Sequence, residues 1–308
     1  MKHILLTGAT GFLGSHLLKA LIEQEYKVTI VKRSTSDTWR IAEQENLFSS
    51  FDVDIDSIEG VFEKNHFDVV VHAACNYGRG GGTVLDLIEA NILFGVEIAR
   101  LSVEYSVPQF INFDTFFSKY YKPELYMADY VLSKIQFLEW LKYYSSKLKV
   151  INLVCHHVYG ENEGGGKFVY WLKENILENN KNIPLTSGDQ KRDFVHVNDV
   201  VRFCIAVMRA DLKLNFNSFE VGSGEVRSIR EFVEVFHGKM KANGIGLEAT
   251  LDFGAIVSNN EIMDVASDIS ESRNIGWSPS LTMEEGVEKL AFELSKGFKN
   301  DNNCNTNI

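Results

Sequence analysis

Short apolar runs alternate with helical patterns through the first half of the chain. Runs typical of buried strands lie at residues 4–6, 28–32, 67–74, 110–113 and 150–154, with a weaker one at 51–53. Apolar residues recur at helical spacing after residue 11, and further helices are expected at about 86–102 and 130–145. This alternation predicts an α/β fold in which helices cover both faces of a doubly wound parallel sheet.

The second half of the chain is less regular. Helices are expected at 168–178, 200–209, 229–240, 268–274 and 282–294, with a strand near 219–221. We expect residues 1–160 to form the sheet domain, with about 193–222 returning to it, and residues 161–298 to form a smaller, mostly helical substrate lobe. The polar residues 299–308 are expected to be a disordered tail. Because ligands of open parallel sheets bind at the carboxyl ends of the strands, the lobe should close over that edge.

Three glycines follow the first apolar run at three-residue spacing, namely Gly8, Gly11 and Gly14. The first permits a tight turn, the second lets phosphates approach the backbone, and the third lets the helix lie close to the sheet. The amino terminus of that helix offers N–H groups and a partial positive charge to an anion. The stretch therefore predicts a dinucleotide-binding domain with a pyrophosphate site, rather than a glycine turn without a ligand.

The end of the second strand indicates which dinucleotide is expected. NAD-binding sheets place an acidic residue there to bond the adenosine ribose, but this strand ends Lys32-Arg33-Ser34, and the next carboxylate is Asp37. The guanidinium of Arg33 could pair bidentately with a 2′-phosphate, and Lys32 beside it adds positive charge. We therefore expect NADP(H), with NAD(H) as the alternative. The competing interpretation is that Lys32 and Arg33 only cap a solvated strand end.

Composition and charge narrow the class of protein. The 308 residues are 45% hydrophobic and 24% charged, and they carry a formal net charge of −11 with no basic block. That balance argues against nucleic acid or an anionic membrane as a partner. The apolar runs are far shorter than the ~18 residues of a membrane-spanning helix. The four cysteines lack metal-ligand spacing, so we expect reduced thiols and no metal site. They are Cys75, Cys155, Cys204 and Cys304. We therefore expect a soluble, cytoplasmic protein.

A candidate acid–base pair lies in the helix predicted at 130–145. Tyr130 and Lys134 are four residues apart and therefore share one helix face. A nearby ammonium favours phenolate, so we expect a lowered pKa for Tyr130, as proton transfer near neutral pH requires. Tyr143 and Lys147 have the same spacing but lie on another side of the helix. We choose Tyr130 because a strand and Thr115 precede it, and the threonine hydroxyl could bond the same substrate oxygen.

Ordered motifs over residues 1 to about 295 resemble the extended short-chain dehydrogenase/reductases, which have a Rossmann-type sheet. The motifs are the three glycines, Asp68-Val-Val-Val-His-Ala-Ala74, Asn91-Ile-Leu-Phe-Gly95, Tyr130 with Lys134, Val158-Tyr-Gly160, Arg192-Asp-Phe-Val-His-Val-Asn-Asp199 and Gly222-Ser-Gly-Glu225. The resemblance implies that the catalytic residues are Thr115, Tyr130 and Lys134. It implies cofactor contacts from Gly8, Thr10, Gly11, Phe12, Leu13, Arg33, Asp52, Val53, Ala73, Ala74, Tyr130 and Lys134. Implied substrate contacts come from Arg79, Thr115, His157, Lys167 and Arg192.

The same resemblance implies a role for each of the main side chains. Tyr130 would donate a proton to a sugar oxygen as hydride arrives from the nicotinamide, Lys134 would hold the nicotinamide ribose, and Thr115 would orient the carbonyl. Arg192 would bind the substrate pyrophosphate, unless it belongs to a surface ion pair. Arg79 could reach the sugar or be solvated in a mobile glycine-rich loop.

Three stretches look more narrowly like the bacterial synthases of CDP-abequose and CDP-paratose. They are Asn76-Tyr-Gly-Arg79, Leu185-Thr-Ser-Gly-Asp-Gln-Lys-Arg-Asp-Phe194 and Glu220-Val-Gly-Ser-Gly-Glu225. This implies NADPH-dependent reduction of the C4 ketone of a CDP- or dTDP-linked 4-keto-deoxysugar, in deoxysugar biosynthesis for surface polysaccharide such as O-antigen. The alternatives are a nucleotide-sugar C4 epimerase that recycles NAD, and a non-catalytic NADP-sensing protein. Family analogy also implies a homodimer formed through the helices at 86–102 and 130–145.

Three departures from the family pattern modify the prediction. Dehydratases of the family carry an Asp-Glu pair after the catalytic threonine, whereas Phe116-Phe117 follow Thr115 here, so dehydration is not expected. His157 replaces the usual asparagine and could contact substrate or be an ordinary core histidine. Residues 258–261 stand where a late arginine is usual, which leaves the nucleotide base open.

Overall fold

The structure is a computed structural model that describes residues 1–79, 81–257 and 262–304, with side chains as far as residue 296. The chain folds as two compact units. The sheet unit comprises Met1–Cys155, Val200–Val221 and Ser270–Trp277, and the helical unit comprises His156–Asp199, Gly222–Ile269 and the chain from Ser278 onward. The sequence placed the corresponding boundaries at residue 160 and at about residues 193 and 222. Among the described residues, every helix is too short or too polar to cross a membrane.

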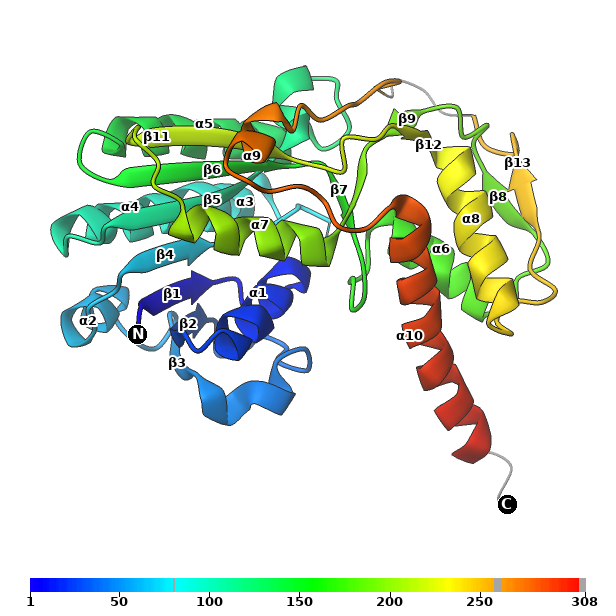
Figure 1. The fold of residues 1–308 in the computed structure, drawn as a ribbon, viewed down its shortest axis with the longest axis horizontal. Coiled ribbons are helices and arrows are strands. Elements are labelled where there is room, and N and C mark those ends of the chain that lie inside the picture. Colours follow the sequence, from blue (N-terminus) through cyan, green and yellow to red (C-terminus); the bar gives the residue numbers. More distant parts are fainter. Residues whose placement is uncertain (80, 258–261, 305–308) are drawn as a thin grey trace. The chain divides into compact units, whose positions relative to one another are not determined.

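Seven parallel strands form the sheet of the described sheet unit (Figure 1), in the order β11-β6-β5-β4-β1-β2-β3. Their bounds are β1 His3–Thr7, β2 Lys27–Lys32, β3 Ser49–Asp52, β4 Val69–His72, β5 Gln109–Thr115, β6 Lys149–Cys155 and β11 Phe216–Val221. The central strands β1, β4 and β5 are buried along their whole length. Strands covered on both faces are rich in apolar residues, which is why the sequence revealed them. The expected α/β fold with a parallel sheet is confirmed.

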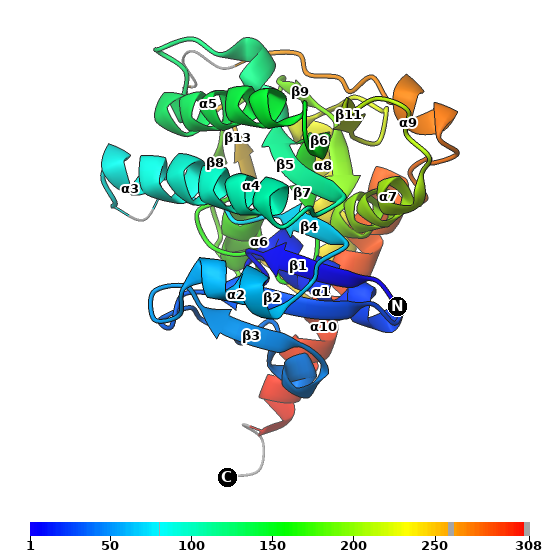
Figure 2. The same cartoon turned by 90° about the vertical axis from the view of Figure 1, so that its left-hand side faces the viewer.

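Helices cover both faces of this sheet (Figure 2). One face carries α2 Ile58–Lys64, α4 Phe94–Glu104 and α5 Ala128–Tyr144, and the other carries α1 Phe12–Glu23 and α7 Val197–Arg209. Apolar side chains from the first face and from the strands form one buried core that includes Phe62, Ile98, Phe110 and Phe137. Shorter elements are η1 Ala42–Leu47, η3 Phe116–Tyr120 and α9 Ser270–Asn274. The arrangement is the doubly wound one that alternating strands and helices predict.

The helix predicted at 86–102 starts earlier and has an irregular middle. Thr83 and Asp86 form a capping box, so α3 (Val84–Ile88) begins at residue 84. A π-helical turn, Glu89–Leu93, then joins α3 to α4. Such turns interrupt the α-helical ladder and often occur at functional sites. This one contains Asn91, whose side chain is buried.

The parallel register brings the carboxyl ends of the strands to one edge of the sheet. Thr7, at the end of β1, pairs with Val31 of β2 and with His72 of β4, and Lys32 of β2 pairs with Asp52 of β3. The segments that follow these strands therefore leave the sheet side by side. They include the glycine turn after β1, residues 33–41 after β2 and residues 73–79 after β4.

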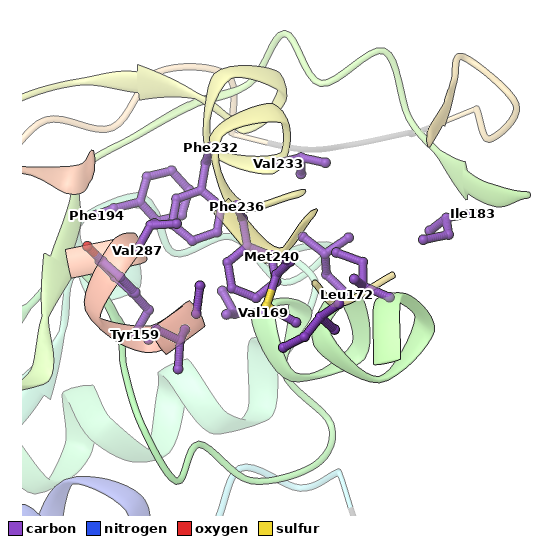
Figure 3. Packing of buried hydrophobic residues seen from close by; sticks show 14 of the residues in the cluster. Tyr159, Val169, Leu172, Ile183, Phe194, Phe232, Val233, Phe236, Met240 and Val287 are labelled. Carbon is purple, nitrogen blue, oxygen red and sulfur yellow. The ribbon is translucent and has the colours of Figure 1, made fainter. Parts of the chain in front are cut away.

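The helical unit packs α6 (Phe168–Leu177), α8 (Ile229–Ala242) and α10 (Met283–Cys304) around an apolar core (Figure 3). Phe194 and Phe232 stack within it, with ring centroids 4.1 Å apart. Short strands pair as β7 His157–Tyr159 with β10 Phe194–His196, β8 Ile183–Leu185 with β13 Leu251–Phe253, and β9 Lys191–Arg192 with β12 Arg227–Ser228. The sequence did not predict these six strands, because two or three residues are too few to show a hydrophobic period. The helix α10 extends through residues 299–304 of the predicted tail, and residues 305–308 lie outside the described residues.

Candidate active site

Two of the three glycines in the first turn are required by backbone packing alone. Gly8 has φ +71°, and a Cβ on it would lie 2.5 Å from the amide nitrogen of Ala74. A Cβ on Gly14 would lie 1.9 Å from the Gly8 carbonyl oxygen. Gly11 is different, because it is exposed and a Cβ on it would meet only that oxygen, at 3.3 Å. Packing therefore restricts position 11 less than positions 8 and 14, and the approach of a phosphate remains the predicted reason for its glycine.

The turn opens onto the amino terminus of α1, where an anion would be favoured. Gly11 is the N-cap residue, and in the described part of the chain no side chain caps the helix and no acidic residue lies in its first turn. The N–H groups of the first helical turn and the helix dipole would favour a phosphate at this position. Thr10, Phe12 and Leu13 are partly exposed around this turn. Ala74, after β4, is fixed beside it by donating its N–H to the Thr7 hydroxyl, 3.1 Å away. These residues fit a dinucleotide pyrophosphate.

The residues predicted to contact the adenosine part of the cofactor lie at the ends of β2 and β3. The Arg33 side chain is exposed, and its backbone N–H donates to Ser36 Oγ at 3.1 Å. We expected Lys32 to add positive charge beside Arg33. Instead, the Lys32 ammonium is ion-paired with Asp52 on the neighbouring strand. Val53 continues from β3 and donates its N–H to the Lys32 carbonyl at 2.8 Å.

A further guanidinium at this edge was not predicted from the sequence. Arg40 is half-buried, and its Nη1 donates to the Thr10 carbonyl in the glycine turn at 3.4 Å. Its guanidinium lies 4.4 Å from the centroid of the Trp39 ring, a cation–π arrangement. The loop after β2 therefore places the positive charge of Arg40 next to the glycine turn. Residue spacing gave no signal for this, since Arg40 lies thirty positions from Thr10.

Tyr130 and Thr115 are brought together by α5 and the carboxyl end of β5. Tyr130 is only 6% exposed, and its phenol faces the Thr115 hydroxyl. One helical turn further, Lys134 is 4% exposed and its ammonium donates to the Phe113 carbonyl at 2.7 Å. The competing Tyr143 is 69% exposed, and α5 ends at residue 144, before its partner lysine. Burial thus distinguishes two Tyr/Lys pairs that have the same spacing.

The direction of the pKa shift at Tyr130 is opposite to the one predicted. Burial of the phenol is the main cause of a pKa well above its ordinary value, and Cys75, Tyr77 and Asp114 raise it further. The shared helix face predicted that Lys134 would lower the pKa. The ammonium is instead directed at a strand carbonyl, so helical spacing alone did not predict the electrostatics.

The loop after β4 covers this tyrosine. The Tyr77 ring stacks on the Tyr130 ring, with centroids 5.0 Å apart and an interplanar angle of 29°. Arg79 is neither isolated nor simply solvated: its guanidinium lies 5.9 Å from the Tyr77 ring and 5.8 Å from the Tyr126 ring. It also donates to the Met127 sulfur at 3.0 Å. Gly80, next to it, lies outside the described residues.

Asn91 joins that loop to α5. Its Oδ1 accepts from the Asn76 N–H at 2.7 Å, and its Nδ2 donates to the Asn76 carbonyl at 2.8 Å. The same Nδ2 donates to Ser133 Oγ at 2.9 Å. Asn91 therefore positions the loop and the helix that flank the acid–base pair, and the π turn directs its side chain toward them.

Two of the predicted substrate residues in the helical unit, Arg192 and His157, lie near each other. Arg192 is buried, donates to the Lys191 carbonyl at 2.8 Å and lies near His157. Burial, and then the positive charge of Arg192, hold the pKa of His157 well below its ordinary value, so the imidazole is neutral. Lys167 is the N-cap residue of α6 and pairs with Glu163 at 3.3 Å. Residues 258–261, where the family arginine is replaced, lie outside the described residues.

Asp193 organises the loop beside Arg192. Its fully buried carboxylate accepts hydrogen bonds from the Ser223 N–H at 2.6 Å, the Ser223 hydroxyl at 2.7 Å and the Gly224 N–H at 2.9 Å. It also accepts from the Ser267 hydroxyl. The conspicuous Arg-Asp-Phe motif therefore contains a structural carboxylate next to the candidate phosphate-binding arginine.

Comparison with known proteins agrees with this geometry. The profile of the "NAD dependent epimerase/dehydratase family" matches residues 4–222. CDP-abequose synthase of Salmonella muenchen is 31% identical over 295 residues, covering 94% of this chain and 97% of that protein. A putative UDP-glucose 4-epimerase of Methanocaldococcus jannaschii is 23% identical, covering 93% and 96%. The fold matches the crystal structure of Thermotoga maritima UDP-glucose 4-epimerase with UDP-glucose at a TM-score of 0.82 and 20% identity, covering 96% and 99% of the two chains. The chain therefore belongs to the NAD-dependent epimerase/dehydratase family, the extended short-chain dehydrogenase/reductases.

Proposed function

We propose that the protein reduces the C4 ketone of a nucleotide-linked 4-keto-deoxysugar with NADPH, in the biosynthesis of a deoxysugar for surface polysaccharide. The observation that carries the proposal is that the buried phenol of Tyr130 faces the buried Thr115 hydroxyl at the carboxyl end of β5. The similarity to CDP-abequose synthase over nearly the whole chain supports a CDP-linked substrate, with a dTDP-linked one as the alternative.

Each residue of the set has a distinct task in this reaction. Tyr130 donates the proton of its hydroxyl to the C4 oxygen, which converts the ketone to an alcohol. Thr115 donates a hydrogen bond that orients the same oxygen. Lys134 uses one of its three N–H donors on Phe113 and has two more for the hydroxyls of the nicotinamide ribose. The dinucleotide, when bound, supplies the hydride.

The cofactor preference is assigned to two arginines after β2. Arg33 is exposed and lies where the adenosine 2′-phosphate is expected, and Arg40 carries a second positive charge to the glycine turn. A planar guanidinium pairs well with phosphate oxygens. The Lys32–Asp52 ion pair leaves the phosphate to the arginines. NAD(H) is the alternative cofactor.

Substrate binding is assigned mainly to the helical unit. Arg192 binds the pyrophosphate of the nucleotide sugar, His157 beside it offers a neutral imidazole, and Lys167 adds a cation at the start of α6. A buried guanidinium binds a pyrophosphate strongly because little solvent competes. Arg79 is proposed to act on the sugar side, through the tyrosines that it contacts.

A C4 epimerase that recycles tightly bound NAD is the second candidate, because epimerases are among the similar sequences and folds. An epimerase needs Tyr130 first as a proton acceptor and then as a donor, whereas a reductase needs only the donor. Release of NAD on denaturing the purified protein would favour the epimerase. Protein that releases no dinucleotide would favour the reductase.

The direct experiment follows NADPH absorbance with a panel of CDP- and dTDP-linked 4-keto-deoxysugars. Oxidation should occur with at least one of them, and Tyr130→Phe should lower turnover by about 10²-fold or more. The exposed Tyr143→Phe is the matched control and should leave turnover unchanged. Full activity in the Tyr130 variant would remove this residue from the role of acid.

We also propose a homodimer formed through α4 and α5. Large apolar residues are exposed on α5, namely Leu132, Trp140 and Tyr143, and Leu93 is exposed in the turn that precedes α4. Helices with apolar residues on both sides are typically covered on both sides. Sedimentation of the purified protein would test this, and replacement of Trp140 by glutamate should give a monomer.

A further inference from the structure

A buried carboxylate lies immediately beside the acid–base pair and has no part in the reaction described above. Asp114 precedes Thr115 at the end of β5 and is 6% exposed. One of its oxygens accepts from the Thr115 N–H at 2.7 Å and from the Ser118 hydroxyl at 3.3 Å, and the other accepts from Asn152 Nδ2 at 3.2 Å. Three donors from three residues hold this side chain in place.

A polar chain through the sheet supports this carboxylate. Asn152 of β6 accepts from Asn112 Nδ2 at 2.7 Å and donates to Ser218 Oγ of β11 at 3.3 Å, in addition to its bond with Asp114. Central parallel strands normally carry apolar side chains, and burying amides there is costly unless they are hydrogen-bonded. We therefore attribute the polar chain to the positioning of Asp114 next to Thr115.

Tyr77 contacts Tyr130 from the other side. Its ring is stacked on the Tyr130 ring, yet it is itself 42% exposed. It therefore lies between the buried phenol and solvent. Arg79 anchors this cover, because its guanidinium lies against both Tyr77 and Tyr126. Asn91 fixes the start of the same loop through the backbone of residue 76.

The groups that face Tyr130 are Asp114 and Thr115 of β5, and Cys75 and Tyr77 of the loop after β4. Burial and the Asp114 carboxylate oppose a negative charge on the phenol, whereas the threonine hydroxyl favours one. On its own helix, the ammonium of Lys134 is directed to the Phe113 carbonyl. A carboxylate beside a phenol makes phenolate costly, and a ring that excludes water removes the solvation that phenolate needs.

We propose that Asp114 and Tyr77 are positioning residues that hold Tyr130 as a proton donor rather than as a proton acceptor. This inference rests on the proposed reductase function, and it adds a preferred direction of proton transfer. At neutral pH Tyr130 is poised for ketone reduction, and the reverse oxidation, which needs phenolate, is fast only in alkaline solution. The same two residues distinguish this site from one that must begin by removing a proton, as an epimerase does.

Asp114→Asn is the principal test because it removes the charge and preserves the shape. The Asn112 Oδ1 atom has no hydrogen-bond partner among the described residues. Rotation of the Asn112 and Asn152 amides would therefore let the chain of hydrogen bonds run in the opposite direction and accommodate a new amide at residue 114. Tyr77→Leu is the second variant, and its position on the surface makes it independent of the sheet.

Two measurements follow the proton on Tyr130. The first is an ultraviolet titration of tyrosinate in the free protein, with the Tyr130→Phe titration subtracted. The second is the pH profile of kcat for reduction, which falls at alkaline pH as the donor is lost. In both variants we expect the Tyr130 titration and the alkaline limb to move to lower pH, by about one unit for Asp114→Asn. Asp211→Asn, which removes an equal charge from the surface, should move neither.

The titration and the activity separate this inference from the proposed function. If Tyr130→Phe is inactive but neither Asp114→Asn nor Tyr77→Leu shifts the titration or the pH profile, the positioning role is wrong and the reductase assignment stands. If Tyr130→Phe keeps full turnover, the reductase assignment fails. The titration in the free protein then still decides whether Asp114 and Tyr77 hold the phenol in its protonated form.

Discussion

Alanine substitutions in the glycine turn should separate backbone packing from ligand approach. In Gly14→Ala, the new Cβ would lie 1.9 Å from the Gly8 carbonyl oxygen, about 1.5 Å closer than an ordinary contact, and backbone must move to relieve it. Overpacking of that kind costs about 3 kcal/mol or more, against a gain of about 1 kcal/mol from replacing a helical glycine. Gly14→Ala should therefore lower the free energy of unfolding of the sheet unit by about 2 kcal/mol or more.

Gly11→Ala should have the opposite profile. Its Cβ would meet only the Gly8 carbonyl oxygen at 3.3 Å, on an exposed turn, so the free energy of unfolding should change by about 1 kcal/mol at most. A phosphate packed on the turn would nevertheless be displaced, and we expect NADPH to bind at least about tenfold more weakly, a loss of about 1.4 kcal/mol.

Urea denaturation followed by circular dichroism measures the first quantity, and NADPH fluorescence measures the second. The control is Gly60→Ala in α2, where the Cβ would make an ordinary contact of 3.6 Å with the Ser57 Cβ; it should be no less stable than wild type and bind NADPH equally well. Wild-type affinity in Gly11→Ala would refute the assignment of this turn to phosphates. Wild-type stability in Gly14→Ala would refute the packing argument.

Three further predictions concern other parts of the chain. Asp193→Asn removes the charge from a buried carboxylate that accepts several hydrogen bonds, so urea denaturation should show the helical unit losing about 2 kcal/mol or more; a loss no larger than that of Asp252→Asn, on an exposed position of β13, would contradict this. Burial, and then the charge of Lys134, hold the pKa of His72 at about 3, so the unfolded chain takes up a proton that the folded one does not. His72 should therefore contribute about 2 kcal/mol to the fall in the free energy of unfolding between pH 6.5 and pH 5. His72→Asn should reduce the fall by that amount, whereas the exposed His66→Gln should leave it unchanged. Arg33→Ala should raise the KM for NADPH at least about tenfold and leave that for NADH unchanged; equal values for the two cofactors in the wild type would defeat the assignment to a 2′-phosphate.

Much of the sheet unit could be predicted because its signals are local. Strands β1 and β4 are covered on both faces, so each contains an apolar run bounded by polar residues. The glycine turn is marked by three residues within seven positions. The Tyr130/Lys134 pair follows from helical spacing. The structure added the reason to prefer it over Tyr143/Lys147, which is burial.

Features that depend on neighbours distant in sequence were missed or predicted in the wrong sense. Lys32 was expected to add positive charge at the cofactor edge, but Asp52, twenty positions later, pairs with it across two strands. Arg40 reaches the glycine turn from thirty positions away. The short strands of the helical unit exist only as pairs, and each is too short to be recognised alone.

By itself the sequence determined the parallel sheet, the glycine turn and the candidate acid–base pair, because backbone geometry imposes each of them on residues close together in the chain. Only the tertiary structure decided how the site is charged. Burial of Tyr130, with Tyr77 stacked on its ring and Asp114 in the same site, raises the pKa of the phenol. Electrostatic free energies depend on separation in space and on exclusion of solvent, and neither quantity is a function of position along the chain.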